Sequence, residues 1–215
     1  SWIYALSLHD ALPILGHSAV KVDGKEKVSG AALYTNDLEF GPDLLYAEIV
    51  EGPHAHAMIN SIDTSEAEKI PEVLAVVTGK DFPYKFGLYM KDRYIFAQDR
   101  VRFYGEQIAA VVARTPQAAK KAAKLVKVNY TPLPKVTDPM EAIREGADLI
   151  HPDLKNYDHV PWFFPKPATN VAHHRKIRKG DADKGFAEAD FILDDTYEVP
   201  RFSHCAIEFH AAVAK

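Results

Sequence analysis

Two stretches with apolar residues at alternate positions flank a Gly52-Pro53 corner. Residues 44–50 place apolar side chains at every second position, and a second apolar stretch covers residues 58–62. Alternation with a period of two is typical of strands that bury one face. The pattern therefore predicts two strands joined by a rigid corner.

The residues that follow the corner predict a mixture of short helices and strands. Thr115-Pro116 is a strong helix start, because Thr is a good N-cap and Pro fits the first helical position. Gly105 marks a tight turn between two apolar stretches. The expected elements are a helix at 66–70, a buried strand at 73–78, a strand–turn–strand unit at 100–113, a helix from 116 to about 125, and a strand at 126–130. Together they predict an α+β domain.

Weaker patterns describe the rest of the chain. A Pro- and aromatic-rich stretch, 136–170, predicts an ordered connector packed on another surface rather than a flexible tether. Loops are expected at 20–30 and 80–93, strands at 31–35, 171–177 and 191–199, short helices at 140–145 and from 180, and a further element at 202–214.

Composition and charge exclude several classes of protein. A net charge of −4 without a long basic run gives no reason to expect nucleic-acid binding. No apolar stretch reaches about 18 residues, which argues against a membrane span. The lone Cys205 excludes an internal disulfide framework and a cysteine-ligated cluster within this chain. A reducing cytoplasm is the simplest compartment.

Both ends of the sequence have unusual features. Residues 6–14 match the in-frame translation of a common sequencing adapter, so we expect residues 1–14 to be a non-native artefact. The last residues, 212–215, lie in an apolar run without a polar tail. We therefore expect the chain to be a piece of a longer protein.

Two local motifs have both a chemical and a structural interpretation. His54 and His56 share one face if the backbone is extended, but a metal site needs further donors, and none stands at ligand spacing nearby. The favoured interpretation is that they bind backbone carbonyls at the corner. Gly105 is expected to adopt positive φ, with Glu106 facing solvent or an arginine.

Residues 203–210 form the richest polar cluster in the sequence. In an extended segment, His204, Glu208 and His210 lie on one face, whereas Cys205 lies on the other. Burying such a face requires a polar ligand to receive it. The cluster therefore predicts a binding segment, and we expect no metal ligand and no catalytic residue in this chain.

Four blocks stand in a fixed order along the chain: Val22 to Asp37, Gly52 to Ala57, Val101 to Ala113 and Glu208 to Ala214. In this order and spacing they resemble the large, molybdopterin-binding subunit of the xanthine dehydrogenase and aldehyde oxidase family. The resemblance covers residues 18–215.

The resemblance implies an architecture and a chemistry. Residues 18–135 would form an α/β hammerhead domain, 136–170 a connector, and 171–215 the truncated start of the first molybdopterin-binding α+β domain. The family hydroxylates or dehydrogenates electron-poor carbon at a molybdopterin centre (the cytosine dinucleotide or a similar form). Electrons then pass to a 2Fe-2S subunit and an FAD subunit, which implies a hetero-oligomer.

The resemblance also suggests which residues contact the cofactor. These are Phe202, Ser203, His204 and Glu208. Phe202 stands where many members have a glutamine near the apical oxygen of molybdenum, so that hydrogen bond would be absent. The catalytic glutamate of the family lies beyond Lys215, and we therefore expect residues 1–215 to be inactive alone.

The resemblance is compatible with three classes of substrate: a purine, an aldehyde and an N-heterocycle. The 82–95 loop, with Phe86-Gly87-Leu88 followed by the motif Tyr94-x-Phe96-Ala97-x-Asp99, resembles the 4-hydroxybenzoyl-CoA reductase branch. The alternative function is a stand-alone hammerhead module that binds or assembles without catalysis. The reading frame after Lys215 separates the two, because an enzyme requires Gly-rich cofactor loops and a late glutamate.

Overall fold

The computed structural model describes residues 18, 20–206 and 208–215. It divides the chain into two compact units, one formed by residues 42–192 and the other by the described residues up to 41 and from 193 on. The expected artefact at residues 1–14 lies outside the described residues. Within the described part, no helix is long and apolar enough to cross a membrane.

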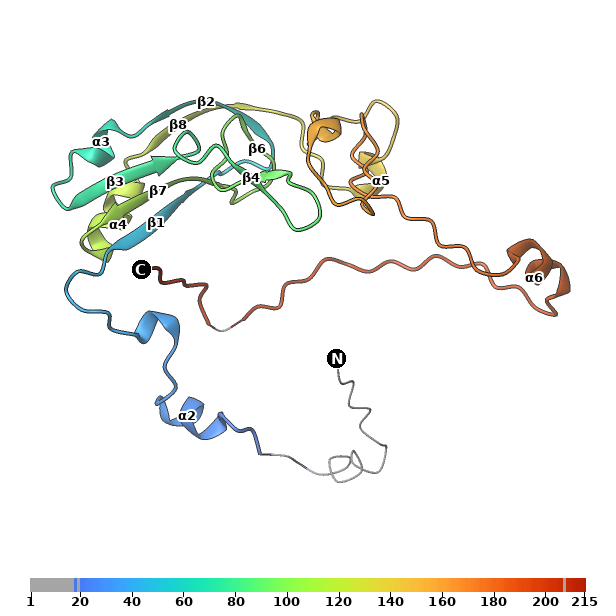
Figure 1. The fold of residues 1–215 in the computed structure, drawn as a ribbon, viewed down its shortest axis with the longest axis horizontal. Helices are drawn as coiled ribbons and strands as arrows, with labels where there is room; N and C mark the ends of the chain where they lie inside the picture. Colours follow the sequence, from blue (N-terminus) through green and yellow to red (C-terminus); the bar gives the residue numbers. More distant parts are fainter. Residues whose placement is uncertain (1–17, 19, 207) are drawn as a thin grey trace. The chain divides into compact units, whose positions relative to one another are not determined.

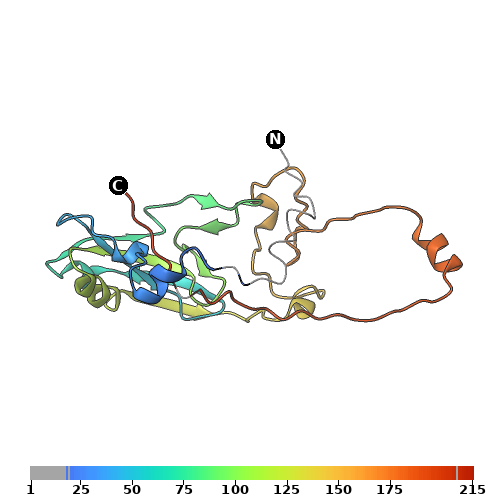
Figure 2. The same ribbon diagram turned by 90° about the horizontal axis from the view of Figure 1, so that it is seen from below.

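One antiparallel sheet of the 42–192 unit has β7 (Gln107–Ala113) at its centre (Figure 1). β1 (Tyr46–Glu51) and β3 (Val73–Thr78) pair with its two edges. The helix α4 (Pro116–Ala123) packs against all three strands, as Figure 2 shows from another side. β7 is almost entirely buried because it has a neighbouring strand on each side and a helix on one face.

A second antiparallel sheet has β2 (Ala57–Asp63) between β6 (Arg100–Val101) and β8 (Lys127–Pro132). Ile108 of β7 belongs to the same buried cluster as Ala57 and Val101 of the second sheet. The two sheets therefore share one apolar core. The other members of this cluster are Ala97 and the partly buried Ile59, Ile62, Val128 and Tyr130.

Short elements make up the remainder of the described chain. They are α2 (Gly24–Ser29), α3 (Ser65–Glu68), β4 (Lys85–Phe86), β5 (Arg93–Tyr94), α5 (Pro139–Ala142), α6 (Ala182–Glu188) and the 3₁₀ turns Thr35–Asp37 and Leu154–Asn156.

The strands and the main helix expected between residues 44 and 130 are confirmed. Thr115 caps α4, because its Oγ1 accepts a hydrogen bond from the Ala118 amide at 3.2 Å. Gly105 has φ +82°, as its predicted turn requires. Its two flanking strands nevertheless belong to different sheets and do not form a hairpin.

Several other expectations are wrong. Residues 24–29 form a helix instead of a loop, and Gly30 ends it at φ +73°. Residues 31–35 form no strand, and the expected loop at 80–93 contains β4 and the start of β5.

The two strands expected at 171–177 and 191–199 are absent from the described residues. Their backbone groups have no neighbouring strand with which to form a ladder. A strand needs such a partner to satisfy its hydrogen bonds, whereas α6 nearby satisfies its own.

The Pro- and aromatic-rich connector folds onto the 87–91 loop. The Lys91 amide donates to the Asp158 carbonyl at 2.8 Å, and the Val160 amide donates to the Tyr89 carbonyl at 2.9 Å. Met90, Leu154 and Tyr157 form a small buried cluster with Phe163 packed against it. The connector is therefore an ordered segment that packs on the 87–91 loop.

Candidate functional site

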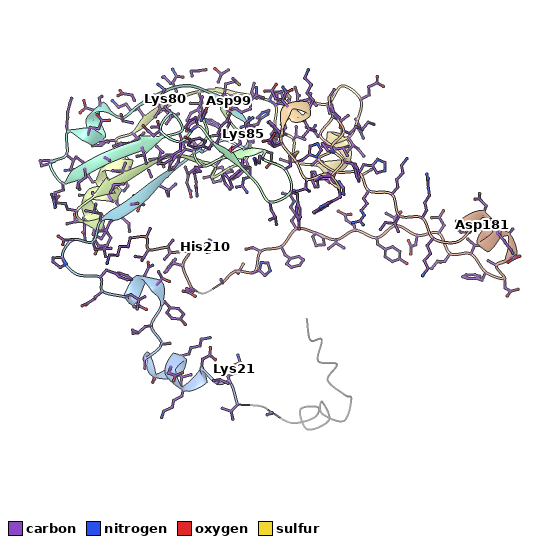
Figure 3. All side chains as sticks on the ribbon, in the orientation of Figure 1. Lys21, Lys80, Lys85, Asp99, Asp181 and His210 are labelled. Atoms are coloured by element: carbon purple, nitrogen blue, oxygen red, sulfur yellow. The ribbon has the colours of Figure 1, made fainter. Side chains whose placement is uncertain are left out.

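The segment that carries the four predicted cofactor contacts has no helix or strand among its described residues. Figure 3 labels His210 on it. Phe202, Ser203, His204 and Glu208 are all exposed, and Phe202 is 81% exposed. The structure therefore places these residues on one segment but does not bring their side chains together.

The polar groups of this segment are available for a ligand. The Ser203 hydroxyl accepts a hydrogen bond from the Cys205 amide at 3.3 Å, and Cys205 has φ +48°. Between described residues of 199–215 there is no backbone–backbone hydrogen bond. A hydroxyl, an imidazole, a carboxylate and main-chain amides form a donor and acceptor set that fits a pterin ring and a phosphate. Phe202 adds only an aromatic face.

The corner histidines make structural contacts. His56 is 5% exposed, and its Nδ1 lies 2.9 Å from the Pro134 carbonyl oxygen, so the predicted backbone contact is confirmed for His56. The His54 ring meets the edge of Tyr130 with centroids 4.8 Å apart. Among the described residues, no group of three or more His, Cys, Asp and Glu side chains is arranged to hold a metal.

Glu106 is buried beside Arg102, so of the two surroundings expected for it, solvent and an arginine, the second is confirmed. Its side chain is only 7% exposed, and its Oε2 accepts a hydrogen bond from the Arg102 amide. Burial raises the pKa of Glu106, while the Arg102 amide and guanidinium oppose that rise. Asp99 in turn contacts Arg102 at 3.4 Å. The Glu106 carboxylate therefore stabilises the 99–106 turn through its hydrogen bond with the Arg102 amide.

A titratable pair, His151 and Tyr157, lies in the middle of the connector, and no pattern in the sequence indicates it. His151 Nδ1 lies 3.2 Å from the Tyr157 hydroxyl, and Lys85 Nζ lies 4.2 Å from the centre of the Tyr157 ring. Burial, aided by the positive charge of Arg102, lowers the pKa of His151 to about 4. Figure 3 labels Lys85 and Asp99 in this densely packed part of the unit.

An open groove of about 480 Å³ lies where the connector meets the 87–91 loop. Its walls are residues 87–91 and 158–161. Tyr89 and Trp162 flank this region edge to face, with ring centroids 5.2 Å apart. The aromatic composition of both segments is visible in the sequence, but their pairing depends on backbone hydrogen bonds that no sequence pattern encodes.

Comparison with known proteins identifies two domains in the chain. A model described as aldehyde oxidase and xanthine dehydrogenase, a/b hammerhead domain, matches residues 29–134. A model of the molybdopterin cofactor-binding domain matches residues 163–215. The second match includes all four predicted cofactor contacts.

Curated relatives match nearly the whole chain. It is 36% identical to a probable xanthine dehydrogenase subunit of Bacillus subtilis, over 92% of this chain and 25% of that protein. It is 34% identical to the nicotinate dehydrogenase large molybdopterin subunit of Eubacterium barkeri, over 94% of this chain and 44% of that protein. The chain thus spans less than half the length of these relatives.

Solved structures show the same likeness. A Cu,Mo-CO dehydrogenase structure matches with a TM-score of 0.62 and 31% identity, over 82% of this chain and 23% of that one. The aldehyde oxidoreductase from Desulfovibrio gigas matches with a TM-score of 0.55 and 34% identity, over 61% of this chain and 16% of that one.

Proposed function

The chain belongs to the xanthine dehydrogenase and aldehyde oxidase family, and we propose that it is part of the molybdopterin-binding large subunit of a molybdenum oxidoreductase. The observation that carries this proposal is the order of two matched domains in one chain, the hammerhead at 29–134 and the cofactor-binding domain at 163–215. The relatives named as xanthine and nicotinate dehydrogenases support it.

The proposed reaction oxidises or reduces an aromatic, heterocyclic or aldehyde substrate. When bound, the molybdenum cofactor supplies the site for oxygen and electron transfer, and the protein binds and orients both partners. The electrons would pass to iron–sulfur and flavin groups on partner subunits. Xanthine, which is a purine, and nicotinate are the first substrates to test, because they occur in the names of the relatives.

We assign the cofactor contacts of this chain to Phe202, Ser203, His204 and Glu208. The donor and acceptor groups of the three polar residues suit the cofactor. Ser203 and His204 can donate to phosphate oxygens, and Glu208 can accept from ring N–H groups. Phe202 offers a ring face where a hydrogen-bond donor is expected from the resemblance.

The proposal is tested by purifying the full-length protein from cells that make the cofactor. We expect about one molybdenum per large subunit by elemental analysis, and a pterin nucleotide on acid release. Reduction by a purine, nicotinate or aldehyde should then bleach the flavin and iron–sulfur absorbance of the complex. A full-length protein without molybdenum would overturn the proposal.

Single variants test the assigned contacts. His204→Ala and Glu208→Gln should lower molybdenum content several-fold, because each removes a charge-assisted or neutral hydrogen bond to the ligand, worth on the order of 1–3 kcal/mol. Glu198→Gln, an exposed substitution in the preceding residues, is the matched control. Unchanged molybdenum in both site variants would show that the contacts lie elsewhere.

The alternative of a stand-alone hammerhead module has less support. Such a module needs no cofactor-binding domain, yet residues 163–215 match one. Sequencing the gene beyond the codon for Lys215 tests the choice directly. A stop codon there, in an independently sequenced genome, would favour the module.

A further inference from the structure

The side-chain amide of Asn170 forms hydrogen bonds that join separate parts of the connector. Asn170 Nδ2 donates to the Ala142 carbonyl at 3.0 Å and to the Asp148 carbonyl at 2.9 Å. Asn170 Oδ1 accepts from the Ile150 amide at 3.0 Å. Both N–H groups and the oxygen of the amide are therefore used, across 20 to 28 residues of sequence.

These contacts need an amide and not merely a polar group. Two carbonyl oxygens require two donors, and the Ile150 amide requires an acceptor, which is the complement of one carboxamide. Ala142 is the last residue of α5. Its carbonyl group has no hydrogen-bond partner within so short a helix. A carboxylate at position 170 would instead face two carbonyl oxygens and supply no donor.

A tight turn holds Asn170 in this position. The Lys166 amide donates to the Val171 carbonyl at 3.0 Å, and Thr169 Oγ1 donates to the Lys166 carbonyl at 2.7 Å. Ala168 has φ +58°, a left-handed conformation that non-glycine residues rarely adopt. Such a conformation persists where surrounding contacts determine it.

The chain is fixed up to the residues that follow this turn. The His174 amide donates to the Phe164 carbonyl at 3.0 Å, and the His173 ring stacks on Phe163 with centroids 4.5 Å apart. From residue 175 to residue 206, every described residue is exposed. The Asn170 contacts thus stand at the end of the packed part of the connector, inside the segment matched by the cofactor-binding domain.

We propose that Asn170 is a positioning residue for the cofactor: it fixes the path by which the chain leaves the hammerhead and enters the molybdopterin-binding domain, and cofactor retention depends on it. This inference rests on the proposed function. Asn170 does not itself touch the cofactor in this proposal. Asn170 affects cofactor retention by holding residues 139–174 in their observed conformation.

The test uses the full-length enzyme and three variants, Asn170→Asp, Asn170→Ala and Asn156→Asp. Asn156 is an exposed connector residue whose side chain makes no hydrogen bond to another described residue, so it carries the same charge change without the contacts. Each protein is dialysed at about pH 8 and at about pH 5, and the molybdenum that remains is measured over time.

We expect Asn170→Asp to lose molybdenum about tenfold faster than wild type at the higher pH, since the net contribution of one hydrogen bond corresponds to such a factor. The difference should narrow at the lower pH: the two facing carbonyl oxygens disfavour the ionised carboxylate, so a larger fraction of the new side chain is protonated there and regains one donor. Asn170→Ala should lose molybdenum quickly at both pH values. Asn156→Asp should follow wild type in both molybdenum retention and turnover.

Two results would overturn the inference. One is wild-type retention in both Asn170 variants, and the other is equally fast loss from Asn156→Asp, which would indicate a general effect of charge. If Asn170→Asp does not fold, Asn170→Ala decides the question on retention alone. A wild-type enzyme without molybdenum would instead overturn the proposed function, which separates the two failures.

Discussion

Residues 46–132 and residues 171–215 have similar apolar patterns but different structures. In the first region, the apolar side chains of β2 and β7 meet in one buried cluster. In the second, Phe191, Leu193 and Val199 are largely exposed, and no strand forms among the described residues. The contrast indicates that a strand pattern becomes a strand only where another strand can pair with it.

Helices behave differently in the same comparison. α6 forms although none of its residues is buried, whereas α4 buries three alanines against a sheet. A helix satisfies its backbone hydrogen bonds within its own segment, so it needs no distant partner to appear. Its contribution to global stability nevertheless depends on what it buries.

The largest expected effect comes from the shared core. Ile108→Ala should lower the free energy of unfolding by about 3 kcal/mol, because it leaves a cavity where both sheets meet. Ile177→Ala makes the same chemical change at a residue that is 83% exposed, and it should cost less than about 0.5 kcal/mol. Urea denaturation of both variants measures the contrast, and equal costs would contradict it.

Two glycines should respond with opposite signs. In Gly87→Ala, the new Cβ would overlap the Met90 carbonyl oxygen, and the forced shift of backbone should cost about 1–3 kcal/mol. In Gly185→Ala, nothing lies within 4 Å, and α6 should gain up to about 1 kcal/mol of helix stability. Thermal unfolding tests the first variant, and helical circular dichroism tests the second. A harmless Gly87→Ala would mean that the 87–91 loop is not packed as described.

Acid should weaken the connector through His151. The pKa of His151 is lowered to about 4 by burial and by Arg102, below its ordinary value of 6.5. The unfolded chain therefore binds a proton first, and stability is lost as the pH falls from about 6.5 through about 4. The expected loss is about 1–2 kcal/mol, since solvent screens this partly exposed ring. Unfolding free energies from about pH 7 to about pH 4 should show this slope in wild type but not in His151→Asn.

The smallest contrast concerns two helix caps. Thr115→Ala removes the hydrogen bond to the Ala118 amide and should cost about 1 kcal/mol of global stability, because α4 packs on the sheet. Asp181→Ala removes the equivalent bond to the Lys184 amide, but α6 buries nothing. It should therefore reduce helical content while leaving the unfolding midpoint unchanged. A shifted midpoint would show that α6 packs on the rest of the chain.

Local signals predict much of the first region. The Thr115-Pro116 start and the alternation around Gly52-Pro53 each specify structure within a few residues. The short helix α2 escapes prediction because its polar sequence has no apolar stripe, although Gly30 is a suitable stop signal.

The site is less predictable, because its contacts join distant segments. The hydrogen bonds of Asn170 reach back to Ala142, and Tyr157 meets Lys85. No period or spacing in one segment encodes such a contact. The residues of the cofactor segment are identified only through the resemblance, which compares whole blocks instead of local patterns.

The pairing of the strands also determines when, during synthesis on the ribosome, the two sheets can fold. Tyr46 pairs with Ala113, and Ala57 pairs with Pro132, so both early strands wait for partners that are translated much later. Such long-range pairs fold slowly and leave strand edges open in the meantime. The hammerhead can close only after residue 132 has emerged, and the nascent chain up to that point presents unpaired strands to chaperones.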